Sequence, residues 1–127
     1  FDKNETLWGG WWFENDRLKL IHLGDTGYTY DFTSIYEALG SPDVAFIPIG
    51  AYEPRSIMKD SHLNPKESVQ AAIDLKARVA IGMHWGTFTL TDEPVLDPPL
   101  VLSKELNRLN LDNLFKIPKP GQIISLE

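Results

Sequence analysis

The sequence predicts an α/β domain, because segments with the pattern of a strand alternate with segments that have helical spacing. Residues Val44–Ile49 and Arg78–Met83 are apolar runs of strand length, typical of strands covered on both faces of a sheet. Helical patterns over residues 29–39 and 64–76 precede these two runs. We therefore expect the order β-hairpin, α, β, α, β, α, β, β.

The first 40 residues predict a hairpin followed by a helix. Residues 7–13 and 17–23 read as two strands joined by a turn at residues 14–16. The hairpin carries three tryptophans, which either pack on the sheet or form a platform for a ligand. In the helix that follows, Asp31 or Ser34 is the expected N-cap, and Gly40 ends it.

Capping residues define the second helix more sharply than the first. Asn64 is the expected N-cap, Pro65 takes the first helical position, and Glu67 stands three residues after the cap. Prolines predict a loop over residues 89–99. A third helix is expected from Ser103 to about residue 109, followed by short strands at residues 114–117 and 123–126.

Composition limits the classes of partner. The chain has 127 residues, enough for one domain, and a net charge of −6, which disfavours a nucleic-acid backbone or an anionic membrane as the main partner. It contains no cysteine, which excludes disulfides and fits a cytoplasmic protein. No apolar run is long enough for a transmembrane segment. Because the chain begins with phenylalanine, we expect it to be a processed product or a piece of a longer polypeptide.

Three strand ends carry side chains suited to chemistry. Asp25 stands in a Gly-Asp-Thr-Gly turn after residues 18–23, and His84 follows the strand that ends at Met83. Tyr52, Glu53 and Arg55 follow the strand of residues 44–49. Since ligands of α/β sheets gather at the carboxyl ends of strands, these residues are expected at one rim.

Each of these residues also has a purely structural interpretation. Asp25 could hold its turn together, His84 could be buried beside Trp85, and Glu53 with Arg55 could form a surface salt bridge. One aspartate and one or two histidines suit zinc, manganese or iron, but a catalytic zinc normally has three protein ligands. The sequence contains no HxH or HExxH motif. The residues alone therefore predict at most half of a metal site.

Five motifs in fixed order resemble a known family. The chain is similar to the C-terminal half of metallo-β-lactamase-fold hydrolases, in the branch of N-acyl-phosphatidylethanolamine-hydrolysing phospholipase D and bacterial RomA-like proteins. The resemblance implies that residues 1–127 form half of an αββα sandwich, a mixed sheet with flanking helices. The motifs are Leu7-Trp8-Gly9-Gly10-Trp11, Gly24-Asp25-Thr26-Gly27-Tyr28, Ile47-Pro48-Ile49-Gly50-Ala51-Tyr52-Glu53-Pro54-Arg55, His62-Leu63-Asn64-Pro65-Lys66-Glu67 and Met83-His84-Trp85-Gly86-Thr87-Phe88.

The resemblance also implies roles for individual residues. Asp25 matches a carboxylate that bridges two metal ions, and His84 matches the last histidine ligand, on the second metal. His62 matches a catalytic-site histidine near the substrate phosphate, and the loop with Tyr52, Glu53 and Arg55 lies beside the substrate. The implied cofactor is a pair of zinc ions, with manganese or iron as alternatives, and the implied substrate is a phosphodiester or a lipid-like small molecule.

One departure from the family pattern is decisive for the expected activity. The first metal motif of the family, H-x-H-x-D-H, is absent. We therefore expect a missing N-terminal half to supply most metal ligands and this chain to be inactive alone. The alternatives are a non-catalytic binding module that forms a homodimer and a hydrolase of another ester class, such as lactones. The expected location is the cytoplasm, with association to a membrane as a further alternative.

Overall fold

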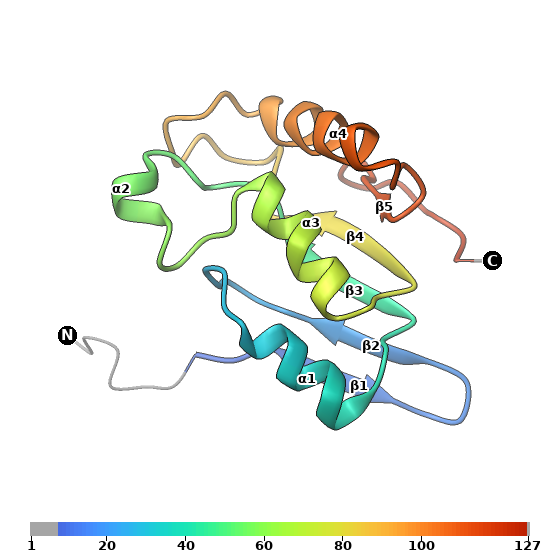
Figure 1. The fold of residues 1–127 in the computed structure, drawn as a ribbon. Coiled ribbons are helices and arrows are strands. Elements are labelled where there is room, and N and C mark those ends of the chain that lie inside the picture. The colour runs from blue at the N-terminus through green and yellow to red at the C-terminus, as the bar shows by residue number, and fades with distance from the viewer. Residues whose placement is uncertain (1–7, 127) are drawn as a thin grey trace.

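The computed structural model describes residues 8–126 and arranges them around one five-stranded sheet (Figure 1). Residues 1–7, including the first residue of the predicted hairpin, and residue 127 lie outside the described part. The strands are β1 (Trp11–Glu14), β2 (Lys19–His22), β3 (Val44–Pro48), β4 (Val79–Met83) and β5 (Phe115–Lys116). The helices are α1 (Asp31–Leu39), α2 (Arg55–Met58), α3 (Pro65–Asp74) and α4 (Asp97–Leu109).

The sheet is mixed, and its strands follow the order of the sequence. β1 pairs antiparallel with β2, whereas β2, β3, β4 and β5 pair parallel with their neighbours. The carboxyl ends of β2, β3 and β4 therefore lie next to one another at one edge of the sheet. The α/β class predicted from the sequence is confirmed.

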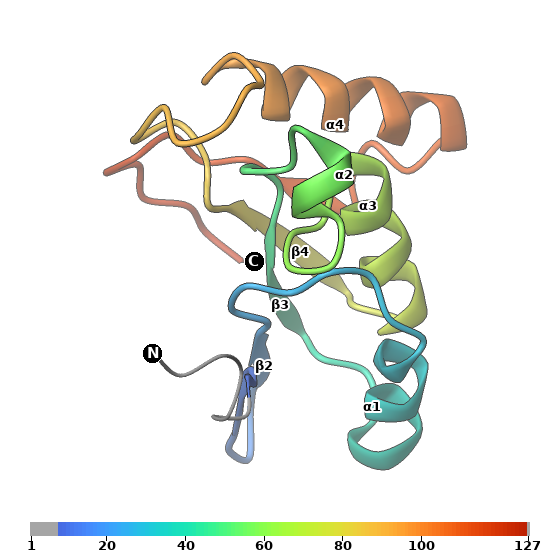
Figure 2. The ribbon, with the colours of Figure 1, turned by 90° about the vertical axis from the view of Figure 1, so that its left-hand side faces the viewer.

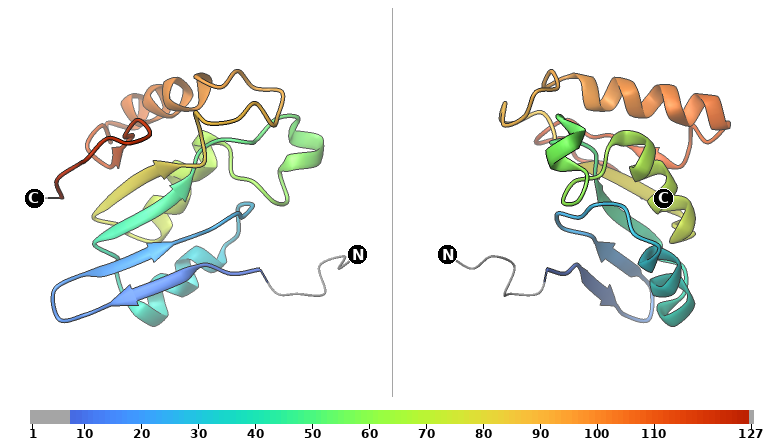
Figure 3. Two further views of the ribbon diagram at one scale, coloured as in Figure 1. Left: turned by 180° about the vertical axis from the view of Figure 1, so that it is seen from behind. Right: turned by 60° about the vertical axis from the view of Figure 1, so that its left-hand side comes forward.

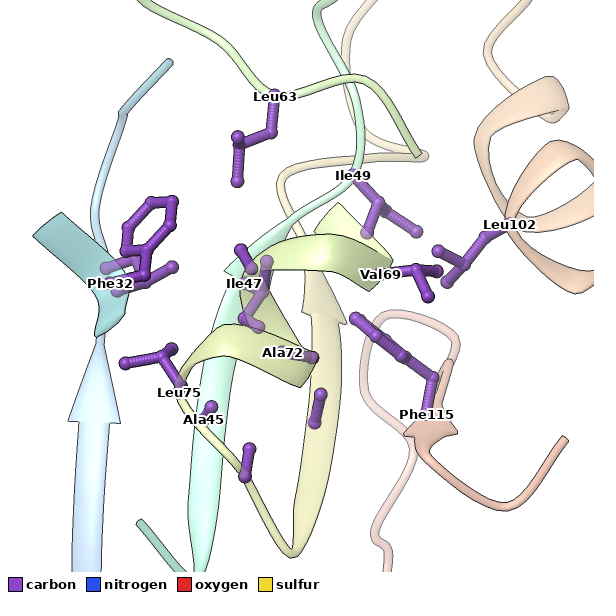
Figure 4. Packing of buried hydrophobic residues seen from close by; sticks show 14 of the residues in the cluster. Phe32, Ala45, Ile47, Ile49, Leu63, Val69, Ala72, Leu75, Leu102 and Phe115 are labelled. Carbon is purple, nitrogen blue, oxygen red and sulfur yellow. The ribbon is translucent and has the colours of Figure 1, made fainter. Parts of the chain in front are cut away.

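Helices cover one face of the sheet and enclose the core. Figure 2 shows α1 and α3 on the same side of the strands, and α4 packs beside α3. Fully buried aliphatic side chains from β3, the C-cap of α3 and α4, such as Ile47, Leu75 and Leu102, fill the space between them (Figure 4). This packing fixes the strand ends that carry the site.

The opposite face is largely uncovered within residues 8–126 (Figure 3). A smaller cluster, Val44, Val79 and Ile81, lies there, and Ile124 and Leu126 from the C-terminal segment pack against it. Further along this face Trp11 is 69% exposed and Phe13 is 55% exposed. The expectation that the tryptophans pack on the sheet therefore holds for Trp12, which contacts the core, but not for Trp11.

Several predicted elements differ from the structure. α2 was not predicted, and α4 begins at Asp97 rather than at Ser103, because prolines are tolerated in the first turn of a helix. The predicted final strand does not form, since no sheet pairing joins residues 123–126. Among the described residues, no helix has the length and apolar character needed to span a membrane.

The caps of α1 and α3 differ in kind. The Asn64 side chain accepts a hydrogen bond from the Glu67 amide at 2.9 Å, and the Glu67 carboxylate accepts one from the Asn64 amide at 2.9 Å. This capping box satisfies two donors of the helix end. The N-cap of α1 is Tyr30, whose side chain makes no capping hydrogen bond. Neither Asp31 nor Ser34 therefore has the predicted role.

Replacing the two predicted cap residues should separate these cases. Asn64→Ala should lower the free energy of unfolding of this chain by about 1 kcal/mol, because the Glu67 amide loses its acceptor. Ser34→Ala, the matched control, should change it by less than about 0.5 kcal/mol, because Ser34 is exposed inside a helix. Chemical denaturation measures both, and equal losses would contradict the assigned caps.

Candidate metal site at the carboxyl edge of the sheet

Asp25 reaches the edge of the sheet on a tight turn after β2. The Leu23 amide still donates to the Phe46 carbonyl at 3.1 Å, and Gly24 then adopts a positive φ of 67°, which glycine tolerates without a steric penalty. Gly24 also donates its amide to Nδ1 of His22 at 3.1 Å. His22 is thus a hydrogen-bonded histidine, and its ring stacks on Phe46.

His84 follows β4 directly and has an uncommon backbone conformation. Its φ is 62°, in the left-handed region that costs a residue with a Cβ atom about 1 kcal/mol or more. The imidazole is 33% exposed and lies 3.4 Å (Nε2 to Oδ1) from the Asp25 carboxylate. The carboxyl ends of β2 and β4 thus deliver an acid and an imidazole to the same place.

His62 joins them from the loop between α2 and α3. Its ring centroid lies 5.4 Å from that of His84. One ligand atom from each of Asp25, His62 and His84 lies within 4.8 Å of the others. We call these three residues the acid–histidine cluster. The sequence predicted the first and last members as metal ligands and placed His62 near the substrate.

Burial sets the electrostatics of His62. Desolvation lowers its pKa below the usual value for histidine, and neighbouring positive charge on His84 and Arg55 acts in the same direction, whereas Asp25 and Glu93 oppose it. Nδ1 of His62 is buried without a hydrogen-bond partner among the described residues. The neutral imidazole favoured by burial is the form that binds a cation.

The cluster fits a metal ion by its chemistry. Imidazole nitrogens and a carboxylate oxygen are the ligands that zinc takes in catalytic sites, and three such ligands leave a fourth position for substrate or water. The buried, unpartnered Nδ1 of His62 is a polar atom that a ligand would satisfy. Three ligands could hold one ion, but they are too few for two.

The loop after β3 contributes to the site in a different way. Tyr52 is buried, which raises the pKa of its hydroxyl, with the Glu93 charge as a further cause. Glu53 accepts a hydrogen bond from the Arg55 amide at 3.0 Å. Nη2 of Arg55 donates to both carboxylate oxygens of Glu67, at 2.9 and 2.8 Å, and Nη1 donates to the His62 carbonyl at 2.8 Å. The structure therefore places these three side chains around the cluster rather than in it.

Two grooves with mainly apolar walls flank the cluster. One, of about 330 Å³, runs from His84 along Trp85, Phe88 and Val95. The other, of about 520 Å³, runs from Asp25 between the tryptophans of the hairpin and Phe32 of α1. A molecule bound at the cluster would have apolar surface available on both sides.

Glu93 is the residue near the site that the sequence analysis did not single out. Its carboxylate accepts hydrogen bonds from the amides of Ala51, Tyr52 and Glu53, at 2.6, 3.3 and 3.0 Å. Glu93 lies in the proline-containing loop before α4, where neither periodicity nor capping position marks it. No pattern in the sequence predicts a contact between residues about 40 positions apart.

Comparisons with known proteins show which family the chain resembles. A family model described as a beta-lactamase superfamily domain matches residues 1–85. N-acyl-phosphatidylethanolamine-hydrolyzing phospholipase D 1 of Caenorhabditis elegans is 46% identical over 99 residues, covering 76% of this chain and 28% of that protein. Outer membrane protein RomA of Klebsiella pneumoniae is 36% identical over 84 residues, covering 66% of this chain and 62% of RomA. The chain thus spans less than a third of the first of these relatives.

Solved structures show the same fold. A Thermotoga maritima structure assigned to Zn-dependent hydrolases of the metallo-beta-lactamase superfamily is 32% identical, with a TM-score of 0.51, over 71% of this chain and 43% of that one. An isothiocyanate hydrolase from Delia radicum gut bacteria is 12% identical, with a TM-score of 0.70, over 89% of this chain and 41% of that one. The second likeness concerns the fold alone.

Replacing the Arg55 guanidinium with an ammonium group should destabilise the chain, although the charge is kept. Arg55→Lys keeps the charge, but its single nitrogen cannot replace both Nη2, which donates to Glu67, and Nη1, which donates to the His62 carbonyl, so the free energy of unfolding should fall by about 1–2 kcal/mol. Arg78→Lys changes an exposed pair with Asp43 and should cost less than about 0.5 kcal/mol. Urea denaturation of both variants checks this, and equal costs would refute the role given to Arg55.

The Tyr28 hydroxyl, which links the segment after Asp25 to α3, should lose its proton only at high pH, because it is hydrogen-bonded to a carboxylate. The hydroxyl donates to Asp74 at 2.6 Å, which raises the pKa of Tyr28 to about 12. A raised folded-state pKa means that the stabilisation is complete below about pH 10 and is lost as the pH rises through about 12. Ultraviolet titration should show a late tyrosinate phase that shrinks in Tyr28→Phe. An unchanged late phase in this variant would contradict the assignment.

Proposed function

The chain belongs to the beta-lactamase superfamily, and from this membership we propose that it supplies the C-terminal half of a binuclear metal-dependent hydrolase that acts on phosphodiesters. The observation that carries the proposal is the convergence of Asp25, His62 and His84 within 4.8 Å at the carboxyl edge of the sheet. Three residues separated in the sequence meet there, and all three are types that bind zinc.

Asp25 and His84 are the proposed metal ligands. Asp25 is half exposed, and its second oxygen could serve a second cation while the first faces His84. A carboxylate can share its charge between two ions in this way, and His84 would hold one of them. Two zinc ions, or manganese or iron in their place, would supply Lewis acidity to the attacking and leaving oxygens of a displacement. Asp25 would thus act in catalysis through the ions that it bridges.

His62 is proposed to contact the substrate phosphate beside the ions. Its carbonyl accepts a hydrogen bond from Arg55, and it stands two residues before Asn64, the N-cap of α3, a place that favours negative charge. Tyr52, Glu53 and Arg55 are proposed to lie beside the substrate on this side. Of the three, Arg55 acts mainly by holding His62, since its guanidinium is already bound to Glu67.

The remaining metal ligands are proposed to come from another polypeptide segment, which would pack on the uncovered face of the sheet. The face carries exposed Trp11 and Phe13 beside the cluster of Val44, Val79 and Ile81. Apolar surface of this kind is typical of an interface. The relative with 46% identity is much longer than this chain, which supports an occupant from the same protein. A second copy of the chain is the alternative occupant, and sedimentation of the isolated chain tests for it.

A lipid-like phosphodiester is the proposed substrate. One relative is named as a phospholipase D that hydrolyses N-acyl-phosphatidylethanolamine. The two apolar grooves on either side of the cluster provide places for the chains of such a molecule. A substrate of this kind would be met by a cytoplasmic protein at a membrane surface.

Metal content and turnover in the complete protein test the proposal. Asp25→Asn and His84→Gln should each lower zinc content and reduce phosphodiester hydrolysis at least about 100-fold, because the first removes a ligand shared by both ions and the second removes a ligand of one ion. His62→Gln should raise KM and leave zinc content unchanged. Asp16→Asn, at the exposed tip of the hairpin, is the control and should behave as the unmodified protein.

A second test of the proposal uses the isolated chain. It should bind zinc weakly and should not turn over bis(p-nitrophenyl) phosphate. Tight binding of two zinc ions with turnover would refute the claim that the chain is half of a site. Turnover of lactones but not phosphodiesters by the complete protein would retain the metal site and overturn the substrate.

A further inference from the structure

The loop that follows β3 turns three successive amides toward one carboxylate. The N–H groups of Ala51 and Tyr52 donate to Oε1 of Glu93, and that of Glu53 donates to Oε2. Ala51 has a φ of 63°, so the chain curls at this point. Consecutive amides in a curled backbone form a concavity that binds anions. Here the anion is an internal side chain.

The same loop is pressed against the backbone of His84. A Cβ atom at Gly50 would overlap the His84 carbonyl oxygen and would lie 3.3 Å from Cβ of Trp85. The amide of Ile49 donates to the carbonyl of Met83 at 3.0 Å just before this contact. The start of this loop therefore packs directly against the backbone of the residue that carries the imidazole.

Segment 84–93 is thus fastened to the loop after β3 at both of its ends. His84 touches Gly50 at one end, and at the other the Asp92 amide donates to the Glu53 carbonyl at 3.2 Å while Glu93 accepts the three amides. His84 needs such support, because its left-handed φ of 62° is unfavourable for a residue with a side chain. Glu93 supplies the strongest of these links, since bonds to a carboxylate are charge-assisted.

The charge of Glu93 is maintained despite its partial burial. Burial raises the pKa of this carboxyl, but the amides of residues 53, 93 and 51 and the Thr91 hydroxyl outweigh that effect, so the pKa lies below its usual value. The carboxylate is therefore ionised at neutral pH. It neither belongs to the acid–histidine cluster nor provides a ligand atom to it.

We propose that Glu93 is a positioning residue, which holds the loop after β3 against the His84 turn and so keeps His84 beside Asp25 and His62. The proposal rests on the proposed function where it concerns metal binding. It extends that function by naming a residue about ten positions beyond the last ligand, in a loop that also lines the groove at His84. Outer residues that orient metal ligands affect metal affinity by roughly 10- to 100-fold when they are replaced.

Glu93→Gln, with Asp92→Asn as its matched control, tests the role in the 127-residue chain. The two variants remove the same charge at adjacent positions, but Asp92 is exposed and its backbone contact with Glu53 does not depend on its side chain. In Glu93→Gln the nitrogen of the new amide faces an N–H group, so at least one of the three bonds is lost. Glu93→Asp keeps the charge with a shorter reach and should give an intermediate result.

Two measurements report the outcome. In the metal-free chain, the nuclear Overhauser contacts between the rings of His62 and His84, whose centroids lie 5.4 Å apart, should weaken in Glu93→Gln and persist in Asp92→Asn. Titration with zinc alone should show an affinity about tenfold lower in Glu93→Gln and unchanged in Asp92→Asn. Unchanged ring contacts in Glu93→Gln, with a zinc affinity equal to that of the control, would overturn the proposal.

The two measurements also separate this proposal from the proposed function. If the unmodified chain binds no zinc, the proposed metal site lacks support from this chain, and the ring contacts alone decide the role of Glu93. If Glu93→Gln fails to fold, Glu93→Asp decides it by the same measurements. A folded Glu93→Asp variant with unperturbed ring contacts and unchanged zinc affinity would then contradict a positioning role.

Discussion

The parallel pairing of β2, β3 and β4 is the constraint on which the site depends. Three adjacent strands that run in one direction end at one edge, so the turn that follows each of them opens into the same space. Residues 25 and 84 are distant in the sequence, yet their side chains come within 3.4 Å because their strands flank β3. An antiparallel central strand would send the loop that positions His62 to the opposite edge. The core between the sheet and α3 keeps this register, since a slip by one residue would expose Ile47 and Ala45.

Backbone geometry at the strand ends then converts proximity into a defined arrangement. Gly24 and His84 both have a positive φ, which turns the chain sharply as soon as each strand ends. Gly27 allows the Asp25 turn to approach the carbonyls of Lys59 and Asp60, which precede His62. Gly50 allows the same kind of approach to His84. The three members of the cluster are thus held through main-chain contacts between neighbouring loops, and the side chains remain available for a ligand.

The sequence predicted the elements that are determined by residues close together in the chain. The apolar runs of β3 and β4 and the Asn64–Glu67 capping box are of this kind, and the structure confirms them. The start of α4 was placed six residues late, because Pro98 and Pro99 were interpreted as helix breakers although they occupy the first turn. Asp25, His62 and His84 were recognisable from the motifs that contain them. The links of Glu93 to residues 51–53 and of Arg55 to Glu67 depend on tertiary approach, and a single sequence carries no periodic trace of such contacts.

Some charged residues around the cluster are already bound by other groups of the protein, and others are not. This contrast supports the position of the site. Arg55 is neutralised by Glu67, and Glu93 is saturated by three amides, so neither has a strong interaction left for a ligand. Asp25, in contrast, is half exposed, and among the described residues its carboxylate has the single close contact to His84. Nδ1 of His62 is likewise buried without a partner in that part of the chain. Within residues 8–126, Asp25 and His62 therefore present a carboxylate and an imidazole whose binding capacity is not used up by structural contacts. The second half proposed above would account for both features, since it would supply further ligands at the cluster and an apolar layer on the largely uncovered sheet face.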